Sequence, residues 1–204
     1  MDKVFLNFPI TLLRPAFNNM KRVCIDIIDY AVYRHSLTLQ GNELKKVKDS
    51  AHYFDITLGN ALESLKNGKD LYQSYKEKPV MTGISRDLLS KYLKNDKSDF
   101  EIALLLSFLA AKSILGKKSF CRVTSETLLC RMAGYASKSE LKELTEPLKK
   151  YQTRYHLDSL KFELKKSFGL KIYGRYTRGF FISFELPEEQ LIKEVEMKRK
   201  KYYE

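Results

Sequence analysis

The sequence predicts a mostly α-helical protein with a small β-hairpin close to its C-terminal end. Glycine and proline interrupt helices, and they are sparse here, with nine and five residues in a chain of 204. Hydrophobic residues make up 44% of the chain, enough for a packed core, and most recur at the three- and four-residue spacing of a helix. The exception is the aromatic stretch 170–185, where two strand-like runs flank a turn.

The first elements are predicted to be an extended segment and a helix. Val4, Leu6 and Phe8 alternate with other residues, so residues 1–15 are expected to be extended. Residues 17–39 follow helical periodicity, and Gly41 then breaks the pattern.

A second helix is predicted over residues 43–65, with Asn67-Gly68 as its stop signal and a short third element at 71–75. Residues 1–80 would form a helical domain. This domain would either form a homodimer or contact another protein.

Residues 79–83 are predicted to be a linker, followed by a short helix that Ser85 caps. Residues 82–93 are also similar to the turn and second helix of a helix-turn-helix. Because Pro79 stands where a first helix would end, a linker helix is the preferred interpretation.

The most apolar helix is predicted over residues 100–115. Hydrophobic side chains lie on nearly every side of it, so the whole helix should be buried. A short strand at 119–123 follows. Thr124 or Ser125 then caps a helix over 126–132.

Two further helices and a hairpin complete the expected order. A helix over 137–151 is interrupted at Pro147, and another spans 155–168. Strands at 170–173 and 180–185 enclose a glycine-bounded turn. Residues 187–204 are expected to form a charged helix or tail.

The net charge of +12 is unevenly distributed along the chain. Residues 117–180 hold 15 Lys and Arg against six Asp and Glu. Such a local basic excess is typical of a phosphate-binding surface, although a solvated basic surface would look the same.

The order helix, strand, helix, helix and hairpin with a basic tip, over residues 99–186, resembles the winged helix-turn-helix group of DNA-binding domains. The resemblance implies that a domain over 81–186 binds duplex DNA, with one helix in the major groove and the hairpin, or wing, along the phosphates. One departure is that residues 135–154 separate the second and third helices. The recognition helix is therefore either 137–151 or 155–168.

In the preferred assignment to 155–168, Leu157, Leu160, Leu164 and Phe168 face the core. The opposite face reads DNA; it carries Tyr155, Ser159, Phe162, Glu163 and Lys166, with Lys165 on its flank. An exposed Phe162 would suit a thymine methyl group, but packing against the inserted helix is the more ordinary role. The candidate DNA contacts are Lys117, Lys118, Arg122, Ser159, Phe162, Glu163, Lys165, Lys166, Arg175, Tyr176 and Arg178.

Enzymatic and metal-binding functions find no support in the sequence. The three histidines and three cysteines are scattered, with no Cys-x-x-Cys pair, which argues against zinc. The sequence contains neither a phosphate-binding loop nor a dinucleotide fingerprint. We therefore expect no enzyme activity, no cofactor and no metal.

A cytoplasmic protein without membrane contact is expected. No segment approaches the run of about 18 apolar residues that a membrane-spanning helix needs. The first residues do not resemble a signal peptide, and three sparse cysteines suit a reducing compartment.

The predicted function is therefore non-enzymatic, sequence-specific DNA binding of the transcriptional-regulator type. A plasmid or mobile-element replication initiator built from winged-helix units is an alternative. A helical interaction module that binds an acidic protein partner is another.

Overall fold

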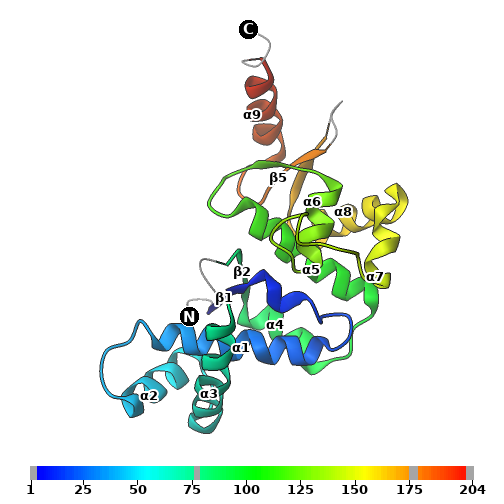
Figure 1. The fold of residues 1–204 in the computed structure, drawn as a ribbon. Helices are drawn as coiled ribbons and strands as arrows, with labels where there is room; N and C mark the ends of the chain where they lie inside the picture. Colours follow the sequence, from blue (N-terminus) through cyan, green and yellow to red (C-terminus); the bar gives the residue numbers. More distant parts are fainter. Residues whose placement is uncertain (1–3, 76–78, 175–178, 201–204) are drawn as a thin grey trace. The chain divides into compact units, whose positions relative to one another are not determined.

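The computed structural model describes residues 4–75, 79–174 and 179–200, without the side chains of the last two, and is mostly helical with two small sheets (Figure 1). The chain divides into two compact units, Met1–Ser98 and Asp99–Glu204. The predicted boundary after residue 80 therefore lies too early. We call these unit 1 and unit 2 and describe each separately.

Unit 1 contains a two-stranded antiparallel sheet whose strands come from its first residues and from the segment before α4 (Arg86–Lys94). Strand β1 (Phe5–Pro9) pairs with β2 (Met81–Ser85), and a 3-10 helix, η1 (Ile10–Leu13), follows β1. The predicted linker at 79–83 thus contributes a strand. This pairing ties residues 81–98 to unit 1 and explains the difference in the domain boundary.

Four helices complete unit 1: α1 (Met20–Ser36), α2 (Glu43–Phe54), α3 (Leu58–Ser74) and α4 (Arg86–Lys94). Helix α1 is central and packs against the other three. The Ser85 hydroxyl caps α4 by accepting a hydrogen bond from the Leu88 amide, as predicted. Because strand β2 precedes α4, residues 82–93 are not part of a helix-turn-helix.

The predicted helix over 43–65 is two helices. Asp55 ends α2 in the left-handed region at φ 48°, a conformation that aspartate tolerates better than most residues. The Thr57 side chain then accepts a hydrogen bond from the Asn60 amide and starts α3.

The predicted stop at Asn67-Gly68 is also wrong, because α3 continues through both residues and includes the segment 71–75 up to Ser74. A Cβ atom on Gly68 would lie 2.7 Å from the Asp29 carbonyl carbon and 2.7 Å from the Tyr33 Cβ. Gly68 therefore allows α1 and α3 to approach closely, and it does not end a helix.

Unit 2 is built around α5 (Asp99–Leu115), which is buried over most of its length, as predicted. The elements that follow α5 are β3 (Cys121–Val123), α6 (Ser125–Met132), α7 (Glu146–Lys149), η2 (Lys150–Gln152), α8 (Arg154–Phe168), β4 (Lys171–Tyr173), β5 (Phe180–Ser183) and α9 (Glu188–Lys200). The strands form one antiparallel sheet in the order β3-β5-β4.

The predicted helix over 137–151 is mostly absent. The Glu140 carboxylate accepts hydrogen bonds from the Ser137 hydroxyl and the Ala136 amide, and such local bonds compete with helix formation. Pro147 has no N–H and restricts the residue before it, so only the short α7 begins there.

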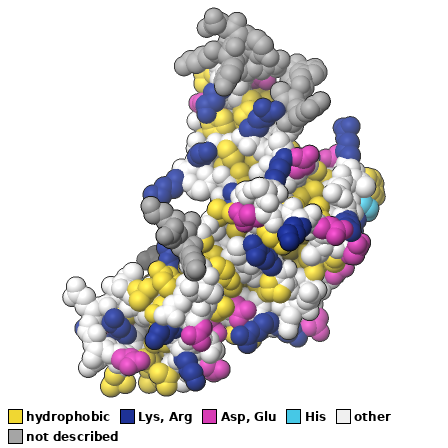
Figure 2. All heavy atoms as spheres, in the orientation of Figure 1, with side chains coloured by type: hydrophobic (Ala, Val, Ile, Leu, Met, Phe, Trp, Pro, Cys, Tyr) yellow, Lys and Arg dark blue, Asp and Glu magenta, His cyan; other side chains and the backbone are white. Residues whose placement is uncertain are grey.

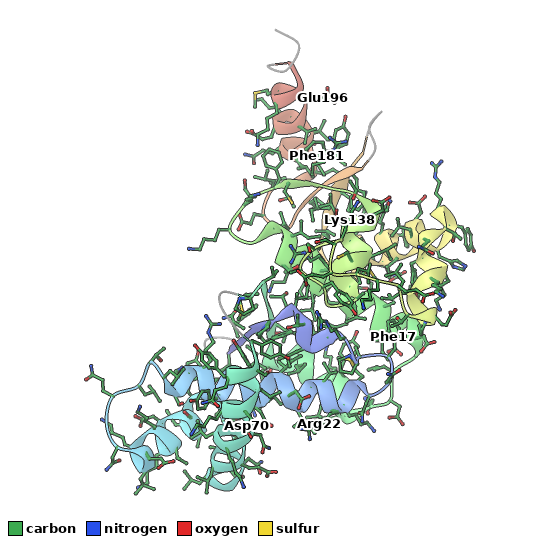
Figure 3. All side chains as sticks on the ribbon, in the orientation of Figure 1. Phe17, Arg22, Asp70, Lys138, Phe181 and Glu196 are labelled. Atoms are coloured by element: carbon green, nitrogen blue, oxygen red, sulfur yellow. The ribbon has the colours of Figure 1, made fainter. Side chains whose placement is uncertain are left out.

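The charged C-terminal segment forms helix α9, which packs against the sheet (Figure 3). Leu191 and Val195 are buried against Phe120, and the Tyr173 hydroxyl donates a hydrogen bond of 2.8 Å to the Glu196 carboxylate. Helix α9 is therefore an integral part of unit 2.

Within the three ranges that the structure describes, no helix is both long enough and apolar enough to cross a membrane.

Candidate nucleic-acid interface

Helix α8 is held in unit 2 by one apolar face. Leu157, Leu160 and Leu164 are buried, which confirms the predicted core face. Phe168, in the last turn, stacks on Phe108 of α5 with ring centroids 4.3 Å apart. Gly169, at φ 66°, ends the helix in the left-handed conformation that glycine adopts without strain.

The opposite face of α8 carries a row of exposed side chains that includes two aromatic rings. Tyr155 is 80% exposed and Phe162 64% exposed, and Ser159 and Lys166 are exposed beside them. Spacings of four, three and four residues place all four on one stripe of the helix, which we call the α8 outer stripe. The alternative in which Phe162 packs against an inserted helix is therefore wrong.

Tyr155 lies on the outer face that the helical spacing predicted, although it was not among the predicted DNA contacts. The same helical periodicity that selects Ser159 and Phe162 also selects Tyr155.

Two other predicted contacts on α8 are engaged within the protein. Glu163 is half-buried and accepts a hydrogen bond of 3.4 Å from the Ser167 hydroxyl. Lys165 is exposed and forms an ion pair of 3.7 Å with Glu188 at the start of α9. Both therefore flank the outer stripe.

A second group of side chains lies at the base of the β4–β5 hairpin. Arg122 on β3 faces Phe181 in the strand register, and its Nε lies 3.5 Å from the position of a Cβ on Gly179. The Lys161 ammonium lies 4.4 Å from the Phe180 ring centroid. Arg122 and Lys161 both lie near the hairpin base, but Phe181 and Phe180 are neighbours in β5 and point to opposite faces of the sheet, so each cation lies on its own face. The predicted contacts Arg175, Tyr176 and Arg178 lie outside the described residues.

Lys117 and Lys118 are exposed, but they lie at the other end of the sheet. Val123 pairs with Phe180, next to the hairpin turn, whereas the Ser119 carbonyl accepts a hydrogen bond from the Ser183 hydroxyl. Lys117 and Lys118 precede Ser119, so they lie beyond the end of β3 that is farther from the hairpin turn. The structure therefore does not bring these two lysines to the hairpin base.

Several cations of unit 2 are neutralised by neighbouring carboxylates. Arg154 and Lys161 both pair with Asp158, at 3.4 and 3.1 Å, and Lys149 lies 2.6 Å from each of the Glu143 and Glu146 carboxylates. The hydrogen bond from Lys149 lowers the pKa of Glu143.

In the described part of unit 2, Lys117, Lys118 and Lys166 form no ion pair. Figure 2 shows Lys and Arg side chains scattered among apolar and acidic ones on the visible face of unit 2. Lys166, on the α8 outer stripe, is thus available to a phosphate.

The thiols and potential metal ligands of the described residues do not assemble into a reactive centre. No group of three or more His, Cys, Asp and Glu side chains could hold a metal ion there. Burial raises the pKa of Cys24 to about 12 and also raises the pKa values of Cys121 and Cys130, which disfavours the thiolate at neutral pH.

Comparisons of the chain with models of protein families, with curated proteins and with solved structures found no match.

Proposed function

We propose that unit 2 binds duplex DNA without catalysing a reaction, and that the protein is a sequence-specific transcriptional regulator. The α8 outer stripe would enter the major groove, and the base of the β4–β5 hairpin would lie along the phosphates.

The observation that carries this proposal is the α8 outer stripe itself. Two large aromatic side chains exposed on one face of a helix present apolar surface that a binding partner would cover. A major groove about 12 Å wide admits one α-helix. Within it, Phe162 could contact a thymine methyl group, Ser159 a base edge and Lys166 a phosphate.

The order of elements supports the same proposal. Unit 2 runs helix, strand, helix, short helices, helix and hairpin, the order on which the winged-helix resemblance depends. The short α7 and η2 occupy the insertion, and η2 has only three residues. Helix α8, with 15 residues, is therefore the stronger candidate for the recognition helix.

A replication initiator with two DNA-binding units is the second candidate, because unit 1 contains another closely joined pair of helices. Residues 55–57 alone separate α2 from α3, and a two-stranded sheet lies in the same unit. Preference for repeated origin sequences over a promoter operator would favour the initiator.

The test is a titration of the full chain against a labelled random-sequence duplex at several salt concentrations. We expect micromolar binding that weakens steeply with salt. Lys166→Ala should reduce the slope of log K against log salt by about 1, whereas Phe162→Ala should weaken binding without changing the slope.

The matched control is Lys117→Ala combined with Lys118→Ala, which removes two charges at the other end of the sheet and should leave the slope unchanged. Absence of binding at low salt would overturn the proposal and favour an acidic protein partner. A slope that responds to Lys117 and Lys118 but not to Lys166 would contradict the use of α8.

A further inference from the structure

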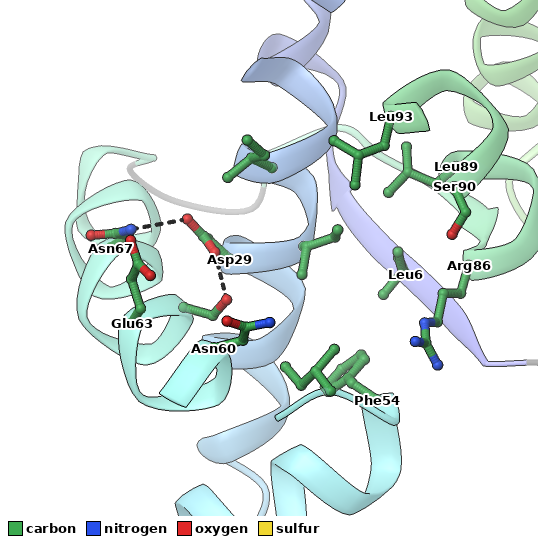
Figure 4. Close-up of a pocket in the computed structure, with 14 residues that line it drawn as sticks. Leu6, Asp29, Phe54, Asn60, Glu63, Asn67, Arg86, Leu89, Ser90 and Leu93 are labelled. Atoms are coloured by element: carbon green, nitrogen blue, oxygen red, sulfur yellow. Dashed lines mark hydrogen bonds between the residues drawn. The ribbon is translucent and has the colours of Figure 1, made fainter. Parts of the chain in front are cut away.

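Unit 1 contains a cavity of about 430 Å³ between α1, α3, α4, β1 and the turn that joins α2 to α3 (Figure 4). Its volume falls within the range of about 300–1,000 Å³ that is usual for small-molecule sites. Much of its lining is apolar, with Leu6, Ile25, Ile28, Phe54, Leu89 and Leu93.

One wall of this cavity carries a buried carboxylate. Asp29 on α1 is only 3% exposed, and it accepts hydrogen bonds from the Ser64 hydroxyl at 2.6 Å and the Asn67 amide at 3.3 Å, both on α3. Figure 4 shows Asp29 directed towards Asn67 on α3, and Leu89 and Arg86 on α4, on the other side of α1 in this view.

Within the described residues Asp29 forms no ion pair, and both of its hydrogen-bond donors are neutral. The two oxygens of a carboxylate accept about four hydrogen bonds, so acceptor positions remain. Burying a charged group without an oppositely charged partner is costly.

Other charged groups leave the cavity acidic. Arg86 also lines it, but its guanidinium already donates to the Asp55 carboxylate at 3.0 Å and to the Asp55 carbonyl at 2.7 Å. Glu63 adds a second carboxylate at the exposed rim.

We infer that this cavity binds a small amphiphilic amine. Its ammonium group would donate to Asp29 on one wall, and its aliphatic body would lie against Ile25, Ile28 and Leu89. The ligand would supply a positive charge, and because Asp29 is almost fully buried, a charge-assisted hydrogen bond to it would be stronger than one in water. Glu63, at the rim, would add a weaker attraction.

The alternative is that Asp29 only joins α1 to α3. An asparagine at this position could keep a hydrogen bond with Ser64, so that role does not require a negative charge. Amine binding does require it, and the two roles therefore give different results.

The experiment titrates the full chain with hexylammonium, with hexanol as the uncharged probe of equal length, and follows amide chemical shifts by NMR. We expect saturable shifts in residues that line the cavity. Hexanol should bind at least about tenfold more weakly than hexylammonium. Asp29→Asn should weaken hexylammonium binding by a similar factor. Asp70→Asn, an exposed change on α3 outside the cavity, should have no effect.

Circular dichroism would first establish that Asp29→Asn folds. If it does not, Glu63→Gln at the rim replaces it, with an expected loss of about two- to fivefold. Equal binding of hexanol and hexylammonium, no saturable binding, or a folded Asp29→Asn protein with unchanged affinity would each overturn the inference.

Discussion

Gly68 lies at a close contact between α1 and α3, and the absence of a side chain there is a packing requirement. Gly68→Ala would force a methyl group against the Asp29 backbone and the Tyr33 side chain. Urea unfolding should show a loss of about 1–3 kcal/mol in the free energy of unfolding.

Gly59 on the same helix provides the matched control. A Cβ there would meet only the Thr57 hydroxyl, at 4.0 Å. Gly59→Ala should be neutral or stabilise the protein by up to about 1 kcal/mol, because alanine is the better helix former. Equal effects of the two substitutions would contradict the packing role of Gly68.

For single residues, hydrophobic periodicity predicted which side chains are buried, but it did not predict which glycines have a particular backbone role. The buried face of α8 follows from the spacing of Leu157, Leu160 and Leu164. The role of Gly68 does not follow from the sequence, because a helix stop and a close helix contact both favour glycine.

At the scale of elements, α9 is the segment whose importance the sequence least indicated. Leu191 is fully buried in a cluster with Val195 of α9 and Phe120, against which Tyr173 and Phe181 of the sheet also pack. Leu191→Ala should lower the free energy of unfolding of unit 2 by about 2–5 kcal/mol, as measured by urea denaturation. Met197→Ala, on the exposed side of α9, should change it by less than about 0.5 kcal/mol. Similar small losses in both variants would mean that α9 contributes little.

Helices with a continuous apolar stripe, such as α1 and α8, could be predicted from the sequence, and so could α5, which is apolar on nearly every side. The breaks at Asp55 and over residues 137–145 could not, because both depend on local hydrogen bonds that hydrophobic periodicity does not reveal.

Strand register explains why three predicted DNA contacts that are close in sequence do not form one surface. Lys117, Lys118 and Arg122 are close in sequence, and a basic run suggested a common surface. The pairing of β3 with β5 instead places Arg122 within the sheet beside Phe181, while the two lysines precede the strand at the end away from the hairpin turn. Charge counts along a chain do not contain this information.

For the whole molecule, the division after Ser98 predicts where the chain can be separated. A fragment of residues 99–204 should unfold cooperatively in urea and keep the salt-dependent binding of duplex DNA. A fragment starting at residue 81, the boundary predicted from the sequence, would carry β2 without its partner β1 and should aggregate more readily. A non-cooperative 99–204 fragment would contradict the independence of unit 2.

The pairing of β1 with β2 also has a consequence during protein synthesis. The two strands are adjacent in space, but α1, α2 and α3 separate them along the chain. Leu6 and Phe8 are both buried in the folded protein, but their strand, β1, can pair only after β2 has emerged from the ribosome. The nascent chain therefore exposes an apolar, unpaired edge through most of the translation of unit 1, which is the interval when a chaperone would engage it.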